Sequence, residues 1–148
     1  MITRNISLMV GVIVLSLTAM SLKAQNTYTW GGANNGSWST VTNWNPNTGY
    51  PGTGGVGGNT DVADINNVTA TQNVTYDAGA SGFLGSLNIT QTSAFVNEVT
   101  LAKNLTLTNG LTLGASGGGT AEVVVPSGFT LTVGGNVTVN AGGNLTAC

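Results

Sequence analysis

The chain has 148 residues, of which only 5% are charged, and it contains five acidic side chains, three basic ones and no histidine. Its apolar fraction of 41% indicates a packed protein, because disordered chains combine low hydrophobicity with high net charge. So few basic side chains exclude nucleic acid and anionic membrane surfaces as partners. The single cysteine, Cys148, excludes an intrachain disulfide.

Residues 1–24 have the pattern of a secretory signal peptide. Arg4 supplies the positive start, residues 6–17 form an apolar core, and cleavage is predicted after Ala24. The apolar run is shorter than the roughly 20 residues that a membrane-spanning helix needs, although an uncleaved anchor is the alternative. Cleavage leaves Lys103 as the only basic side chain against five acids, a net charge of −4. The protein is therefore expected to be secreted.

Residues 25–65 form a second segment, which we interpret as an aromatic, Gly/Asn-rich N-terminal cap. All three tryptophans of the chain lie here, at Trp30, Trp38 and Trp44. The run GYPGTGGVGGNT at residues 49–60 is too rich in Gly and Pro for a regular element and predicts a loop. This loop leads into a strand predicted at residues 60–65.

Residues 66–148 repeat a short phrase of apolar residues alternating with Thr or Asn and ending in Gly or Asn. Alternation with period two predicts half-buried strands, and no amphipathic helix pattern interrupts it. The alternation places on one face Phe129, Leu131, Val133, Val137 and Val139. The last three phrases begin eight residues apart, at Phe129, Val137 and Leu145. Strands this short, with small residues at the corners, predict an all-β fold built as a β-solenoid.

One local signal favours a different architecture. Asn109-Gly110 separates two alternating runs in LTLTNGLTL, and this dipeptide is a strong cue for a β-hairpin. A β-sandwich is therefore the alternative fold. We prefer the solenoid because stacked coils share one continuous core, whereas very short strands in a sandwich each bury little.

The head of residues 27–65 resembles the N-terminal part of large bacterial surface proteins whose passenger is a right-handed parallel β-helix. The matching positions are Trp30, Trp38, Asn43, Trp44, Pro51, Gly52, Asp61 and Ile65. The pattern is similar to that of autotransporter-type adhesins and of secreted repeat proteins from Bacteroidetes-like bacteria, and GFTLTVGGNVTVNAGGNLTA at residues 128–147 is similar to their coils. The resemblance implies a right-handed coil, a position at the first coil for the tryptophans, and a C-terminus truncated within the repeat.

The clustered tryptophans have two interpretations. They close the apolar end of the first coil, or they stack on sugars as a carbohydrate-binding surface made of Trp30, Trp38, Trp44 and Tyr50. The first interpretation is preferred, since an uncovered first coil would expose its interior to water.

Catalytic chemistry is not expected, and we predict no catalytic, cofactor or metal site. Histidine is absent, and Asp61 and Asp64, three positions apart on a strand, should point to opposite faces. The glycine-rich residues 114–119 lack the Lys-Ser/Thr ending of a phosphate loop and are interpreted as a corner between coils.

The sequence as a whole predicts a non-catalytic structural or adhesive segment of a secreted protein at the bacterial cell surface, outside the outer membrane. Its expected partners are extracellular glycans or the surface of a host or neighbouring cell, and self-association through edge strands of an open last coil is also expected. The alternatives are a carbohydrate-binding module and the N-terminal fragment of a β-helical polysaccharide-active enzyme.

Overall fold

The computed structural model describes residues 25–53 and 60–148, which form an all-β protein. The predicted signal peptide at residues 1–24 lies outside the described residues, as do residues 54–59 of the predicted loop. The described part has a single short 3₁₀ helix, η1 (Val41–Asn43), and none of its helices is long and apolar enough to cross a bilayer.

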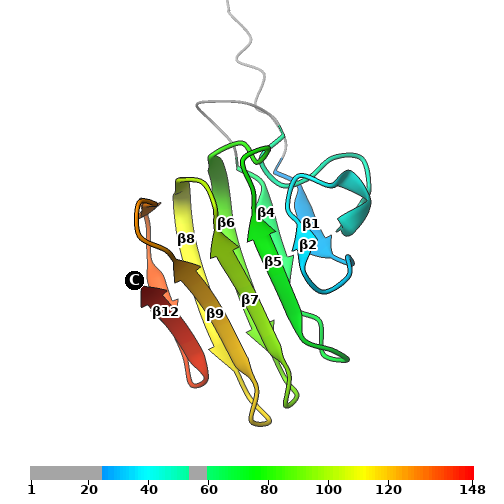
Figure 1. The fold of residues 1–148 in the computed structure, drawn as a ribbon, viewed down its shortest axis with the longest axis vertical. Coiled ribbons are helices and arrows are strands. Elements are labelled where there is room, and N and C mark those ends of the chain that lie inside the picture. Colours follow the sequence, from blue (N-terminus) through cyan, green and yellow to red (C-terminus); the bar gives the residue numbers. More distant parts are fainter. Residues whose placement is uncertain (1–24, 54–59) are drawn as a thin grey trace, which may run out of the picture.

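The strands form two sheets whose strands run parallel except at one end, and the chain passes from one sheet to the other in each coil (Figure 1). The first coil contains β4 (Val62–Ile65) and β5 (Gln72–Tyr76). The second contains β6 (Phe83–Gln91) and β7 (Val96–Leu101), and the third β8 (Leu105–Ala115) and β9 (Thr120–Val125). The fourth contains β10 (Leu131–Val133), β11 (Val137–Val139) and β12 (Gly143–Ala147). About four turns of a β-solenoid result, as predicted.

Three short strands precede the first coil and make up the N-terminal cap. Of these, β1 (Thr27–Trp30) pairs in parallel with β4, and β2 (Gly36–Ser37) pairs in parallel with β5. The third, β3 (Trp44–Asn45), runs antiparallel to β1 and forms the outer edge of its sheet. The expected cap segment of residues 25–65 therefore includes one strand, β4, that the structure places in the first coil.

The core consists of columns of apolar side chains that run from coil to coil. One column contains Ala63, Leu87 and Leu111, which lie in register 24 positions apart and are at most 1% exposed. A second column, in the other sheet, contains Val74, Val99 and Val123. Parallel neighbours at this spacing are the mark of stacked coils. The sandwich alternative is wrong, because apart from the β1–β3 pair the strands of both sheets run parallel.

The eight-residue phrases of the sequence are strands of one coil and not successive coils. The strands β10, β11 and β12 begin at Leu131, Val137 and Gly143 and together make the fourth coil. The true repeat is about three times longer, since Val123 of the third coil lies opposite Leu145, 22 positions later.

The hairpin that Asn109-Gly110 would form in the alternative fold is absent, because both residues lie within the single strand β8. Thr108 and Asn109 are both exposed, so the alternation is interrupted at a bend, and the ladder to β6 shifts register at the same level. The two halves of β8 pair in parallel with β10 and β11. The backbone amide and carbonyl groups of β8 therefore bond to the neighbouring coils on both sides, and they do not pair the two halves of β8 with each other as in a hairpin. Of the glycine-rich residues 114–119, residues 116–119 form the expected turn between β8 and β9, whereas Gly114 and Ala115 end β8.

Glycine is required at this bend because the coils approach closely there. A Cβ atom on Gly135 would lie 1.6 Å from the carbonyl oxygen of Asn109 in the coil before it. A Cβ atom on Gly85, one coil earlier than Gly110, would lie 2.5 Å from the backbone of Thr60. No side chain fits between backbones at these distances, so small residues recur at the same corner of successive coils.

Candidate functional site

The three tryptophans gather inside the N-terminal end of the solenoid. Trp30 ends β1, Trp44 begins β3, and the two are direct partners in the antiparallel pair. Trp38 follows β2, and its amide donates to the Thr75 carbonyl of the first coil at 2.8 Å. All three side chains are buried, with exposed fractions of 3%, 0% and 2% for Trp30, Trp38 and Trp44.

The rings pack edge to face in a connected series. The ring centroids of Trp30 and Trp44 are 5.0 Å apart, and those of Trp44 and Trp38 are 4.6 Å apart. Trp38 continues the series to Tyr76 of the first coil, at 4.9 Å. Edge-to-face contacts at such distances stabilise by about 0.5–1.5 kcal/mol each beyond the area that they bury. The cluster therefore joins the cap to the coils and closes the apolar interior.

Each indole N–H of the cluster has an acceptor within the protein. Trp30 donates to the side-chain oxygen of Gln72 at 3.1 Å, and Trp38 donates to the carbonyl of Pro51 at 3.1 Å. Trp44 donates to the carbonyl of Trp38 at 2.7 Å. Neither the ring faces nor the N–H groups are open to solvent in this conformation. Sugar stacking on these rings, which the binding interpretation requires, would need the cluster to open.

Tyr50, the fourth residue of that interpretation, lies at the margin of the cluster. Its ring is partly buried against the core, and its hydroxyl donates to the carbonyl of Gly79 at 2.9 Å. The structure thus places Tyr50 as a contact between the loop after β3 and the turn after β5. It does not bring the four aromatic rings together on an exposed surface.

An aspartate outside the predicted set holds the cap from the first coil. The Asp77 carboxylate accepts from the hydroxyl of Ser37, from the hydroxyl and amide of Ser39 at 2.7 and 2.8 Å, and from the amide of Gly79 at 2.8 Å. Burial favours the neutral acid, but these hydrogen bonds outweigh it and lower the pKa of Asp77 to about 2. The carboxylate is therefore ionised at neutral pH and bound to both segments.

The other two aspartates lie on opposite faces of the chain at β4. Asp61 is buried and accepts from the amide of Gly52 at 3.1 Å, whereas Asp64 lies on the outer face of β4 and accepts from Asn88 at 2.8 Å. The prediction that Asp61 and Asp64 point to opposite faces is confirmed. Within residues 25–53 and 60–148, no three His, Cys, Asp or Glu side chains are grouped so that they could hold a metal ion.

The outer faces carry rows of polar side chains, as expected from the alternation of apolar residues with Thr and Asn. One row crosses the sheet of β4, β6, β8 and β11 in register and contains Asp64, Asn88, Thr112 and Thr138. A second row crosses the other sheet from β5 to β12 and contains Asn73, Glu98, Glu122 and Asn144. Neighbouring coils lie about 4.8 Å apart, so each row presents closely spaced hydroxyl, amide and carboxylate groups.

The two glutamates of the second row are direct neighbours with the same charge, which is unfavourable on a sheet. Each accepts a hydrogen bond from a threonine hydroxyl, Glu98 from Thr100 at 2.5 Å and Glu122 from Thr146 at 2.6 Å. These contacts offset part of the repulsion and fix the carboxylates on the surface. The 24-residue spacing of Glu98 and Glu122 is the sequence signal that could have identified the row.

Searches against protein-family models, curated proteins and solved structures find no match to this chain.

Proposed function

We propose that this chain is a secreted, non-catalytic structural or adhesive β-solenoid at a bacterial cell surface. The observation that carries the proposal is the separation of aromatic side chains inside the fold from polar side chains on its outer faces. The aromatic residues of the N-terminal cluster are used inside the fold, while the outer faces carry polar side chains in register from coil to coil. Such an arrangement supports an elongated body whose surface makes many similar contacts.

The rows favour hydroxyl-rich partners. Thr112 and Thr138 offer hydroxyl groups at neighbouring coils, and Asn88 offers an amide in the same row. Each hydrogen bond to a glycan hydroxyl adds little in water, about 0.5–1.5 kcal/mol. Repetition over several coils and several molecules raises the avidity without any deep pocket. Extracellular glycans and neighbouring cell surfaces are the partners that we propose.

Secretion is tested by producing the whole 148-residue chain in a Gram-negative host. We expect the exported protein to begin at Gln25 on N-terminal sequencing and to be accessible to protease on intact cells. An unprocessed chain confined to the cytoplasm would contradict the proposal.

Adhesion is tested by binding of the purified protein to immobilised bacterial and plant glycans. The variant Thr112→Val removes one hydroxyl from the middle of the first row at nearly constant volume. The matched control Thr90→Val changes an exposed threonine of β6 that lies outside this row. Weaker binding by Thr112→Val alone supports an adhesive surface, and equal binding by both variants argues against a contribution from the row.

A further inference from the structure

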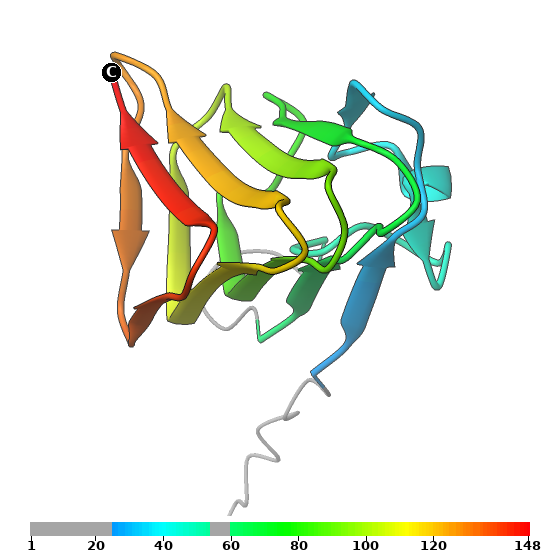
Figure 2. The same cartoon turned by 90° about the horizontal axis from the view of Figure 1, so that it is seen from below.

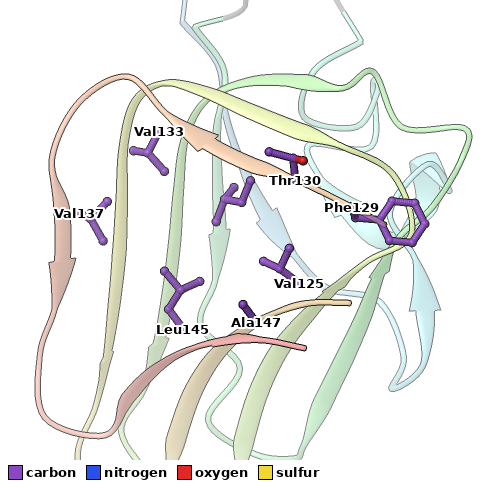
Figure 3. A pocket seen from close by; sticks show the side chains of 8 residues that line it. Val125, Phe129, Thr130, Val133, Val137, Leu145 and Ala147 are labelled. Carbon is purple, nitrogen blue, oxygen red and sulfur yellow. The ribbon is translucent and has the colours of Figure 1, made fainter. Parts of the chain in front are cut away.

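None of the residues that the structure describes covers the apolar interior at the fourth coil. Val137 and Val139 are each 49% exposed and Leu145 is 46% exposed, although they continue columns whose earlier members are at most 1% exposed. Val137 and Leu145 line an open cavity of about 460 Å³ together with Phe129 and Val133 (Figure 3). The fourth coil, whose residues line the cavity, lies at the end of the stack opposite the cap (Figure 2).

The fourth coil also has backbone amide and carbonyl groups that can pair with another strand. In the third coil, the inward-facing residues Leu105 and Leu111 donate their amides to the next coil, to the carbonyls of Thr130 and Asn136. Outward-facing residues bond in the other direction, as Asn140 does to the carbonyl of Leu113. By the same alternation, the inward-facing residues of β10, β11 and β12 direct their amide and carbonyl groups away from the stack. Within the described residues these three strands pair only with the third coil.

The fourth coil carries no charged side chain that would repel a copy of itself. Residues 126–148 contain no Asp, Glu, Lys or Arg, and charged side chains are a principal device by which edge strands avoid pairing. The opposite end is protected in a different way. Its edge strands β2 and β3 have two residues each, and the tryptophan cluster fills the interior behind them. Within the part of the chain that the structure describes, the extended, uncharged edge that a second molecule can offer is therefore the same C-terminal face.

We propose that two copies of this chain dock head to head through their fourth coils. A twofold axis perpendicular to the solenoid axis places β12 antiparallel to β12 of the second copy and joins the two cavities into one apolar core. The contact is isologous and closes at a dimer, because the capped end offers no matching surface. This inference does not depend on secretion or adhesion.

The size of the face sets the strength of the contact. A coil of 22 residues at about 3.3 Å per residue has a circumference of about 70 Å and encloses on the order of 400 Å². With the surrounding strands included, both partners together bury on the order of 1,000 Å², which is at the lower limit for specific interfaces. We therefore expect a dimer that dissociates in the micromolar range.

Sedimentation over a range of protein concentrations tests the proposal, with a reducing agent present so that Cys148 thiols cannot cross-link. Val137→Asp puts a charge on the interior side of the face, and the control Thr138→Asp puts the same charge on the adjacent outward position. Val137→Asp should weaken the dimer at least about tenfold, because a buried unpaired charge is strongly unfavourable. Thr138→Asp should dimerise like the wild type. Circular dichroism checks that both variants fold.

Amide hydrogen exchange of the wild type gives a test that needs no variant. The Leu145 amide should exchange quickly in dilute protein and slowly in concentrated protein, whereas the Asn140 amide, already bonded to Leu113, should be protected throughout. The proposal would be overturned if the wild type stayed monomeric at all concentrations or formed larger open-ended species. It would also be overturned if the Val137→Asp variant dimerised as strongly as the wild type. Concentration-independent exchange at Leu145 would do the same.

Discussion

Truncation of Trp38 should remove a large part of the stability of the fold. Its side chain is 0% exposed and contacts the rings of Trp44 and Tyr76. Replacing a buried tryptophan by alanine costs about 3–5 kcal/mol. The substitution also leaves the buried Pro51 carbonyl without its indole donor, which adds about 1–3 kcal/mol. We expect Trp38→Ala to lower the free energy of unfolding by about 5 kcal/mol, against about 5–15 kcal/mol for a whole domain.

Urea denaturation followed by circular dichroism measures this loss. For a domain of this size, a decrease of about 5 kcal/mol lowers the denaturation midpoint by about 2–3 M. Trp38→Phe keeps a ring against Trp44 and should lose about 2 kcal/mol, because the hydrogen bond and part of the buried area disappear. Val41→Ala, a neighbouring side chain that is 39% exposed, should change stability by less than about 1 kcal/mol. A Trp38→Ala protein within about 1 kcal/mol of the wild type would refute the reasoning.

Three further changes test other contacts. Gly135→Ala should detach the fourth coil and lower the denaturation midpoint markedly, because the new Cβ would meet the Asn109 carbonyl. The control Gly31→Ala should be tolerated, because the space around Gly31 is open. Equal midpoints for the two variants would contradict the close packing at Gly135. Since its folded pKa of about 2 lies below the usual value of 3.8, Asp77 contributes stability that is present above about pH 4 and lost as the pH falls toward 2. Thermal unfolding of Asp77→Asn should therefore vary less with pH in that range, with about 1 kcal/mol lost at neutral pH after allowance for solvent screening. An unchanged profile would argue against stabilising hydrogen bonds from the cap to the Asp77 carboxylate. Gln72→Leu leaves a buried indole N–H unpaired and should cost about 1–3 kcal/mol in urea denaturation, and a neutral result would argue against that hydrogen bond.

Much of the fold follows from local alternation. Residues such as Leu105, Leu107, Leu111 and Leu113 recur with period two, and each is buried in β8. That periodicity predicts strands wherever one face is covered, and the small residues between them predict corners. The apolar alternation is weaker in β7, because its inward position Asn97 is polar. The Asn97 side-chain amide donates to the carbonyls of Thr90 and Asn67, a pairing that only the folded coil provides.

The length of the coil could not be obtained from the phrases alone. Eight residues separate Val137 from Leu145, but these strands lie in different sheets of one coil. The hairpin cue at Asn109-Gly110 failed for a related reason. Turn propensity acts locally, whereas the neighbouring coils supply ladder partners on both sides of β8, and the tertiary pairing prevails.

The candidate site was predictable in its location and not in its contacts. The clustering of Trp30, Trp38 and Trp44 within 15 residues indicates a common role at the first coil. Their acceptors, among them Gln72 and Pro51, are brought to the rings only by the winding of the chain. Such long-range partners leave no periodic trace in the sequence.

The most direct test of this account is hydrogen exchange at the three indole N–H groups, followed by NMR. Trp30, Trp38 and Trp44 should all exchange far more slowly than free tryptophan, because each N–H is buried and hydrogen bonded. Their resonances should also remain in place when glycans are added. Exchange at the rate of free indole, or a shift on glycan addition, would contradict the claim that these rings close the solenoid from within.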